Sequence, residues 1–471
     1  MALSTEEKPQ PLPQHQRQQQ YLAVHDPEKD FARLTPVHSS TSTVEEAIDA
    51  EAGFSNVPAG PTTPAKNDDE PGPAPNGGFQ AWLQVAGSFF LFFNCWGTVN
   101  TFGVFQTYYE NNPYWSESPS NISWIGSIQA FLLLLVGVIT GPVYDAGYFR
   151  PLIIAGSVLI PLGFMMTSLT HTYWQVMLAQ AFLIGLGNGC VFVPSVAILP
   201  QYFTTKKALA NGVAASGSSI GGIIYPIVFR RLEQSVGFGW ATRTCGFISL
   251  VTLWFSVLVM KPRVMPKGRR KLVDFSALTE VPYVLFCVSM FLGFIGFYGP
   301  VFYIQSYAIA ENLTTQNFAF YLLPILNAAS VPGRILPNFL ADRVGPLNML
   351  TPCAAITGIL AFCWIGIHNL PGIIVFAILY GFFSGGFVSM PPVAVVTLTP
   401  DPRTLGTRMG QCFFFSAFGL LCGTPVSGAI YKSTGSFLGV QLFSGITIFL
   451  TGCLLVCARI AAKGSSFRTK A

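Results

Sequence analysis

The sequence predicts an all-α membrane protein that crosses the bilayer twelve times, with its helices arranged in two six-helix bundles. Three observations predict this class. Hydrophobic residues make up 51% of the 471 residues, charged residues make up 10%, and the mean hydropathy is +0.50, which is typical of a chain whose solvent is lipid. Apolar stretches of roughly 20 residues, long enough to cross about 30 Å of hydrocarbon, recur from Trp82 onward. The two halves of the chain also repeat each other.

The twelve expected spans follow one another with short polar breaks between them. In chain order they cover 82–106, 121–143, 151–170, 174–200, 208–229, 240–260, 281–307, 317–340, 348–367, 372–398, 408–430 and 438–459. The longest break is the basic stretch "KPRVMPKGRRKLVDFSALTE", which separates the sixth span from the seventh. These breaks divide the chain into an N-terminal tail (1–77), a first bundle (78–260), a linker (261–280), a second bundle (281–460) and a C-terminal tail (461–471).

The first 77 residues differ from the rest of the chain in composition. They are rich in Pro, Gln and Ser, they carry twelve acidic and five basic residues, and they contain no apolar run for a core. Such a composition predicts disorder. The start, "MALSTEEKPQPLPQHQRQQQ", lacks the apolar region and the cleavage site of a signal peptide. We therefore expect the first membrane helix to target the chain.

Several residues recur at a nearly constant spacing in the two halves. The matched pairs are Asp145 and Asp342, Gly189 and Gly386, and Pro194 and Pro391, each 197 residues apart, and Gly212 and Gly410, 198 apart. Each pair occupies the equivalent span or loop of its half. Internal duplication of this kind is frequent in secondary carriers. The spacing predicts a six-plus-six parallel repeat.

Lysine and arginine gather on one side of the predicted membrane. The loops after the even-numbered spans, together with the C-terminal end, hold 16 of them, whereas the opposite side holds four. By the positive-inside rule both termini are cytoplasmic. The two N-x-[ST] sequons, at Asn121 and Asn312, fall in or beside predicted outer loops, which makes them candidate glycosylation sites.

One charged side chain falls inside a predicted span. Arg334 precedes Asp342, at the end of the same helix, by eight residues, so at 1.5 Å per residue it lies roughly 12 Å deep. Outside the tail, all nine acidic residues lie in loops or at helix ends. A buried arginine without an acid costs a few kcal/mol, and a guanidinium suits bidentate binding of a carboxylate, so an organic anion is the expected partner. Alternatively, Arg334 snorkels or binds carbonyls freed by Pro332 and Pro337.

Other polar and aromatic side chains on the apolar spans are weaker candidates. Five amides either orient a ligand or bond neighbouring helices: Asn100, Gln129, Asn188, Asn327 and Gln411. Of these we select Asn100 and Asn327 as substrate-binding candidates. In the seventh span, the run Phe297, Tyr298 and Tyr303 either stacks on a planar substrate or packs, and Tyr298 is the candidate.

The loops between spans two and three and between spans eight and nine carry a candidate conformational gate. We expect Asp145 and Asp342 to cap the next helix and to pair with nearby arginines, so that the cytoplasmic side stays closed. The gate candidates are Gly141, Asp145, Asp342 and Arg343.

Two short patterns suggest enzymes but lack the required context. "GSSIG" at 217–221 fits G-x-S-x-G, and "GLGNG" at 185–189 is glycine-rich, but neither follows a strand and no histidine or acid is near enough to activate Ser219. The ten cysteines all lie in predicted spans without metal-ligand spacing. We therefore expect no enzymatic activity, metal, cofactor or nucleic-acid partner.

These residues resemble the major facilitator superfamily. The loop "GPVYDAGYFR" matches the family's hallmark loop through Gly141, Asp145, Gly147 and Arg150. The stretch "NGGFQAW" leading into helix one, followed by "NTFGVFQTYYE", is similar to the fungal branch of the monocarboxylate porter family, and Arg334 falls where that family keeps its substrate-binding arginine. The resemblance covers about residues 76 to 460.

The chain also departs from that pattern at several positions. The family's acid before the paired glycines is Asn76 here, and the following tryptophan is Phe79. The lysine and the aspartate of proton-coupled members correspond to Asn100 and Ser330. These departures argue against proton symport by the family's mechanism. Because no buried acid or histidine is present to relay a proton, facilitated diffusion of an organic anion is the simplest mode, and coupling through a proton carried on the substrate's own carboxylate is the alternative.

The resemblance implies secondary transport of a small organic anion, such as a monocarboxylate, by alternating access. We expect a monomer in a lipid bilayer, the plasma membrane rather than an internal one. The family also includes riboflavin carriers and, in fungi, exporters of specialised metabolites, so efflux of such a metabolite is the alternative. A transporter-like receptor, which binds a metabolite without flux, is an alternative of another class.

Overall fold

The computed structural model describes residues 74–110, 117–263, 274–400 and 404–464. All of them belong to one compact unit, Asp68–Ala471, and the secondary structure in these ranges is helical. Most of the expected tails (1–77 and 461–471) and half of the linker (261–280) lie outside the described residues.

The first six expected spans are helical. Their ends lie within about four residues of those predicted, except that the fifth continues past residue 229 to the kink at Gly237. The elements are α2 (Phe79–Glu110), α3 (Pro119–Asp145), α4 (Phe149–Thr167), α5 (Tyr173–Val176), a π-helical stretch (Met177–Ile184), α6 (Gly185–Ala197), α7 (Leu199–Tyr202) and α8 (Lys207–Val259). The fourth span runs through α5, the π-helical stretch and α6. α8 covers both the fifth and the sixth span, which meet at a kink where Gly237, with φ 81°, interrupts the helical geometry. That φ favours glycine.

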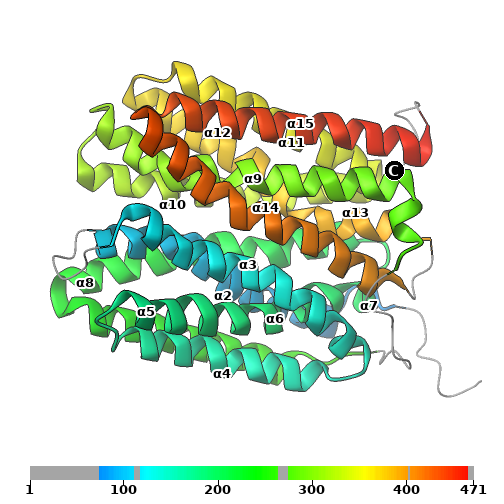
Figure 1. Cartoon of the computed structure of the whole chain (residues 1–471). Coiled ribbons are helices and arrows are strands. Elements are labelled where there is room, and N and C mark those ends of the chain that lie inside the picture. The colour runs from blue at the N-terminus through cyan, green and yellow to red at the C-terminus, as the bar shows by residue number, and fades with distance from the viewer. Residues whose placement is uncertain (1–73, 111–116, 264–273, 401–403, 465–471) are drawn as a thin grey trace, which may run out of the picture. The chain divides into compact units, whose positions relative to one another are not determined.

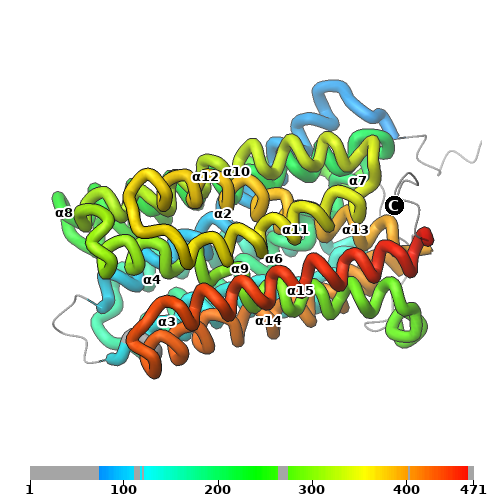
Figure 2. The backbone as a smooth tube through the Cα atoms, turned by 90° about the horizontal axis from the view of Figure 1, so that it is seen from above, coloured from blue at the N-terminus to red at the C-terminus, as the bar shows by residue number. Residues whose placement is uncertain are grey.

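The second set of spans follows the same plan. Its elements are α9 (Val281–Ala310), α10 (Gln316–Val344), α11 (Pro346–Cys363), α12 (Leu370–Ser389), α13 (Pro391–Thr397), α14 (Leu405–Thr434) and α15 (Leu438–Lys463). Figure 1 shows α2 to α8 in one half and α9 to α15 in the other. Within the second half, α15 packs against α9 and α11, and α10 packs against α12, as Figure 2 shows from above.

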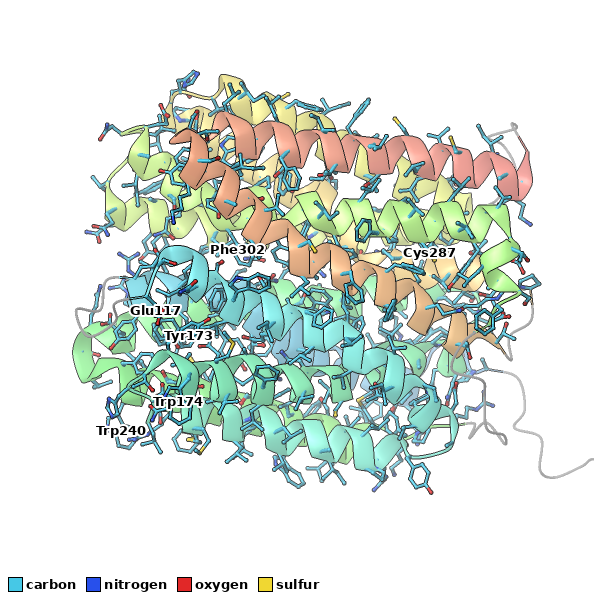
Figure 3. All side chains as sticks on the ribbon, viewed as in Figure 1. Glu117, Tyr173, Trp174, Trp240, Cys287 and Phe302 are labelled. Carbon is cyan, nitrogen blue, oxygen red and sulfur yellow. The ribbon has the colours of Figure 1, made fainter. Side chains whose placement is uncertain are left out.

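Length and apolarity confirm the membrane-spanning class. Among the described residues, ten helices are long and apolar enough to cross a bilayer. Counting the two spans of α8 separately gives eleven, and α2, which has a sufficient length of 32 residues but is not among those ten, brings the described helices to the predicted twelve. Trp174 and Trp240 are 61% and 57% exposed and lie near Glu117 and Tyr173 at one end of the helices (Figure 3). Exposed tryptophans at helix ends are typical of a membrane interface.

The two bundles meet along two seams, one between α8 and α10 and one between α3 and α14. The repeat partners Gly212 and Gly410 hold equivalent places on them. A Cβ on Gly212 would overlap the carbonyl oxygen of Arg334 on α10, and a Cβ on Gly410 would lie 3.6 Å from the Cα of Val138 on α3. Small residues let helix backbones approach closely. Below, the "α7 end" is the one where α2 starts and α15 ends, and the "Gly237 end" is the opposite one (right and left in Figure 1).

Asn76 fixes the start of α2 at the α7 end. Its Oδ1 accepts hydrogen bonds from the backbone N of Thr204, at 2.6 Å, and of Thr205, at 3.0 Å. Its own backbone N donates to the carbonyl of Tyr202 at 3.0 Å, and its φ is 53°. The amide oxygen therefore supplies acceptors to the loop before α8, which a carboxylate would also do.

Candidate functional site

α10 carries a buried polar face toward α8. The members Asn327, Ser330, Arg334 and Asn338 are spaced i, i+3, i+7 and i+11, which places them on one side of a helix, and each is at most 6% exposed. Gly212 and Gly222 face them from α8, since a Cβ on Gly222 would lie 3.0 Å from the amide of Asn327. The polar face of α10 therefore lies on the seam between the bundles.

Arg334 makes its hydrogen bonds to neutral groups. Its Nε donates to Ser330 Oγ at 3.1 Å, and its Nη1 donates across the seam to the carbonyl of Ala215 at 3.3 Å. A guanidinium has five N–H donors. Within the described residues, Ser330 and Ala215 are the hydrogen-bond partners of Arg334, and no carboxylate pairs with it. The side chain is 6% exposed, so it does not snorkel out of the protein. Its carbonyl partner lies on α8 rather than beside Pro332 or Pro337.

Two small cavities flank the guanidinium. One, of about 10 Å³, is lined by all four predicted substrate-binding residues, Asn100, Tyr298, Asn327 and Arg334. The other, of about 30 Å³, lies among aromatic side chains. A cavity of about 10 Å³ holds roughly one water molecule, whereas ligand pockets measure about 300–1,000 Å³. In this conformation the bundles are closed around Arg334.

Weak hydrogen bonds join the other three candidates to the seam. Tyr298 on α9 donates to Asn100 Oδ1 on α2 at 3.5 Å. Asn327 donates to the carbonyls of Gly222, at 3.4 Å, and Leu323, at 3.2 Å. Bonds of this length are at or beyond the usual range, so a ligand with stronger acceptors would displace them at low cost.

The remaining polar candidates bond helices to one another or, in the case of Gln411, to the segment before α9. Gln129 and Asn188 both donate to Thr98 Oγ1, at 3.3 and 3.1 Å, which ties α3 and α6 to α2. Gln411 donates to the carbonyl of Asp274 at 3.2 Å. In the aromatic run of α9, Phe297 lines the smaller cavity, whereas Tyr303 pairs with Tyr431.

Sequence reasoning missed two residues of this site. Trp96 lines both small cavities and stacks on Phe294 at 6.5 Å between ring centroids. It precedes Asn100 by four residues, a spacing that places both on one face of α2 and that the sequence already contained. Ser219, from the GSSIG stretch, donates to Ser330 Oγ at 3.1 Å and so supports the partner of Arg334.

Asp342 joins the two bundles at the α7 end through a contact that differs from the predicted one. Its Oδ1 accepts from the backbone N of Ala208 and its Oδ2 from that of Leu209, both at 2.9 Å. These N–H groups belong to the first turn of α8, which is unsatisfied and partly positive. We expected Asp342 to cap the next helix, α11. It instead caps a helix of the other bundle, because α10 and α8 meet at this seam.

The other gate candidates lie on or near the second seam, with one exception. Asp145 is buried and lines a cavity of about 340 Å³ with Leu405 and Gly406, at the start of α14. A Cβ on Gly141 would lie 3.9 Å from the carbonyl oxygen of Gly406. Arg343 is exposed, and its guanidinium lies over the ring of Phe339, on its own helix, at 4.9 Å.

An ion-pair cluster at the α7 end was not anticipated. Arg408, on α14, donates to Glu280 from Nη1 at 2.8 Å and from Nη2 at 2.5 Å, and its Nε pairs with Asp274 at 3.1 Å. The hydrogen bond from Ser276, together with those from Arg408, lowers the pKa of Asp274. This cluster holds the segment before α9 against α14.

The two sequons lie at the same end of the helices. Asn121, in the first turn of α3, is exposed and donates to Glu117 Oε2 at 2.7 Å. Asn312 follows α9 and is also exposed, with a positive φ of 54°. Both positions belong to the Gly237 end, opposite the Asp342 contact.

Comparisons with known proteins agree with this architecture. The family model "Major Facilitator Superfamily" matches residues 85–356. The MFS-type transporter dbaD of Emericella nidulans is 47% identical over 81% of this chain and 87% of its own length. The aspyridones efflux protein apdF of the same fungus is 39% identical over 82% of this chain and 79% of its own.

Among solved structures, the human organic anion transporter MFSD10 (TETRAN) has a TM-score of 0.61 at 16% identity, with 80% of this chain and 98% of that chain covered. At this identity the likeness concerns the fold alone. The sequence relationship, the twelve helices and the fold together show that the chain belongs to the major facilitator superfamily and is a secondary membrane transporter.

Proposed function

We propose that this transporter exports an organic acid of the fungal specialised-metabolite type and that Arg334 binds the acidic group. The observation that carries the proposal is the buried guanidinium between the bundles, which has two neutral hydrogen-bond partners and no acid within the described residues. The export direction is supported by the printed name of the relative apdF, an efflux protein for aspyridones. The comparisons thus favour efflux, our alternative, over the uptake of a small monocarboxylate.

The proposed cycle is alternating access between the two bundles. An anion at Arg334 replaces Ser330 and Ala215 with stronger, charged acceptors. The cavities of about 10 and 30 Å³ must widen for any metabolite, so binding requires the seams to part on one side. Asp342, with Asp145 and Gly141, would close the α7 end, which we assign to the cytoplasm because it holds the basic loops.

Transport without proton coupling is part of the proposal. The positions where proton-coupled monocarboxylate porters carry a lysine and an aspartate are Asn100, bonded to Tyr298, and Ser330, bonded to Arg334. Neither side chain titrates near neutral pH. We assign the chain to the monocarboxylate-porter-like branch on Arg334 and on the NGGFQAW stretch, and we place it as a monomer in the plasma membrane, with Asn121 and Asn312 outside.

The proposal is tested by efflux from yeast cells that lack endogenous carriers. Cells are preloaded with labelled aromatic acids and short monocarboxylates, and the release rate is compared between wild type and Arg334→Ala. Lys463→Ala, which removes an exposed cation at the end of α15, serves as the control. We expect Arg334→Ala alone to abolish the accelerated release, at unchanged surface expression. Release of every acid at the wild-type rate would refute the role of Arg334, and binding without flux would favour the receptor alternative.

A further inference from the structure

The Gly237 end contains a cavity that is far larger than those at Arg334. It measures about 1050 Å³ and is lined by residues of both halves, from α2, the segment after α4, α8, α9 and α10. We propose that this cavity, the "exit vestibule", is a second binding site for the transported anion, in which Arg230 takes the acidic group. The proposal rests on the proposed function and adds a site that the substrate occupies after Arg334.

The walls of the exit vestibule suit a planar, ring-containing molecule. Tyr108 and Phe238 stack with their ring centroids 4.5 Å apart and their planes 11° apart. Phe229 packs edge-on against Phe238 at 5.9 Å, and Phe320 lines the cavity from α10. Aromatic walls of this kind favour flat apolar ligands. The volume is at the upper limit of ordinary ligand pockets, so a multi-ring metabolite fits here without the helices moving.

Arg230 offers the anion a cation whose bonds are made to neutral groups. Its guanidinium carbon lies 4.1 Å from the ring centroid of Phe320, and its Nη2 donates to Asn317 Oδ1 at 3.0 Å. Within the described part of the chain it has no ion pair. A carboxylate or an enolate is a stronger acceptor than an amide oxygen and would replace Asn317.

The exit vestibule also holds the carboxylate of Glu233, which limits its affinity for an anion. Glu233 lines it one helical turn after Arg230, and His171 lines it from the loop after α4. Arg243 reaches its edge by donating to Ser168 Oγ at 3.1 Å. The nearby carboxylate of Glu233 weakens the attraction for an anion. Weak binding suits a site from which substrate is released.

Occupation of the exit vestibule would also loosen the seam at this end. Arg230 reaches Asn317 and Phe320 on α10, and Arg231 donates to Tyr321 on α10 at 3.3 Å. An anion that takes Nη2 of Arg230 removes one of these contacts between α8 and α10. The contact of Asp342 at the α7 end is unaffected, so binding favours opening toward the Gly237 end.

The test is equilibrium binding of radiolabelled 2-naphthoate to purified full-length protein in lipid nanodiscs. We expect wild type to bind two molecules, one of them weakly, and Arg334→Ala to retain the weak site. Adding Arg230→Gln to Arg334→Ala should weaken that site roughly tenfold, the effect of losing a charge-assisted hydrogen bond. Binding of the neutral analogue 2-naphthamide should stay the same. Lys432→Gln, which removes an exposed cation where α14 ends, at the same end of the helices, is the matched control.

The outcomes separate the two proposals. Loss of all binding in Arg334→Ala would overturn the exit vestibule and leave the central site in place. A weak site whose affinity is unchanged by Arg230→Gln would also overturn the proposal of a site in the exit vestibule. The absence of saturable binding to wild type would overturn it too, since the cavity is present whatever the natural substrate is. Binding that Arg230→Gln weakens but Arg334→Ala leaves at two sites would refute the central site alone. Arg230→Gln in an otherwise wild-type chain covers the case in which Arg334→Ala fails to fold.

Discussion

Replacing Asp342 by asparagine should release the closed seam at the α7 end. The carboxylate accepts two backbone hydrogen bonds at 2.9 Å, from Ala208 and Leu209. A hydrogen bond to a charged group contributes about 1.5–3 kcal/mol. Asparagine keeps the shape and one acceptor oxygen but loses the charge at the start of α8, so we expect a loss of about 2 kcal/mol from the closed conformation. That corresponds to roughly a 30-fold larger open population.

The assay is labelling of a cysteine that the closed seam protects. Val388 lines both small cavities beside Arg334, so Val388→Cys reports opening. A membrane-impermeant maleimide is applied from the α7 side, in a background that lacks the four exposed cysteines, Cys363, Cys422, Cys453 and Cys457. Asp342→Asn should raise the labelling rate roughly 30-fold where the rate follows the open population.

A matched substitution separates the contact from a general charge effect. Arg343 is the neighbour of Asp342, is exposed and lies over Phe339 of its own helix. Arg343→Ala should therefore leave the labelling rate within about twofold, the range of ordinary surface substitutions. An unchanged rate in Asp342→Asn would refute the reasoning, because the two hydrogen bonds would then not hold the bundles together.

Two further predictions concern the packing of the bundles. Gly212→Val should slow transport at least tenfold while the protein remains folded, because the valine side chain would meet the backbone of Arg334 at the seam. Circular dichroism measures folding and an efflux assay measures transport. Efflux at the wild-type rate would contradict the prediction. Arg408→Ala should destabilise the protein by roughly 1–3 kcal/mol, less than for a fully buried pair because the Glu280 side chain is 36% exposed. Thermal unfolding in detergent measures this loss. The pKa of Asp274 is lowered in the folded protein, so its contribution to the free energy of unfolding is present at neutral pH and is lost as the pH falls through that lowered pKa. A destabilisation by Arg408→Ala that stays the same at acid pH would contradict this contribution.

The membrane fold follows from local properties of the chain, which explains why the sequence predicted it. Apolarity over about 20 residues does not depend on distant contacts, so the spans were found to within a few residues. Gly237 marks the partial exception, since the fifth span continues as helix beyond its predicted end and meets the sixth at the kink in α8. Arg334 was found for a similar reason, since its depth in the membrane follows from its distance in sequence to the end of its own helix.

The residues that contact each other across the seams could not be predicted from the sequence. Asp342 caps α8 rather than α11 because helices far apart in the chain pack together, and spacing along the chain carries no information on that. The pairing of Arg408 with Glu280 lies within the second half, but it also joins residues far apart in the chain, and the arginine was counted only as a basic residue at a helix end. The collapse of the cavity at Arg334 depends on side-chain packing from both bundles.

The central claim, that Arg334 recognises a negative charge, is tested most directly with purified protein in liposomes. Flux of 2-naphthoate and of uncharged 2-naphthamide is measured for wild type and for Arg334→Gln. Loss of a bidentate charged contact is worth at least a few kcal/mol, so we predict that wild type transports the acid more than 100-fold faster than the amide and that Arg334→Gln removes most of this preference. An acid preference that survives in Arg334→Gln would contradict the claim.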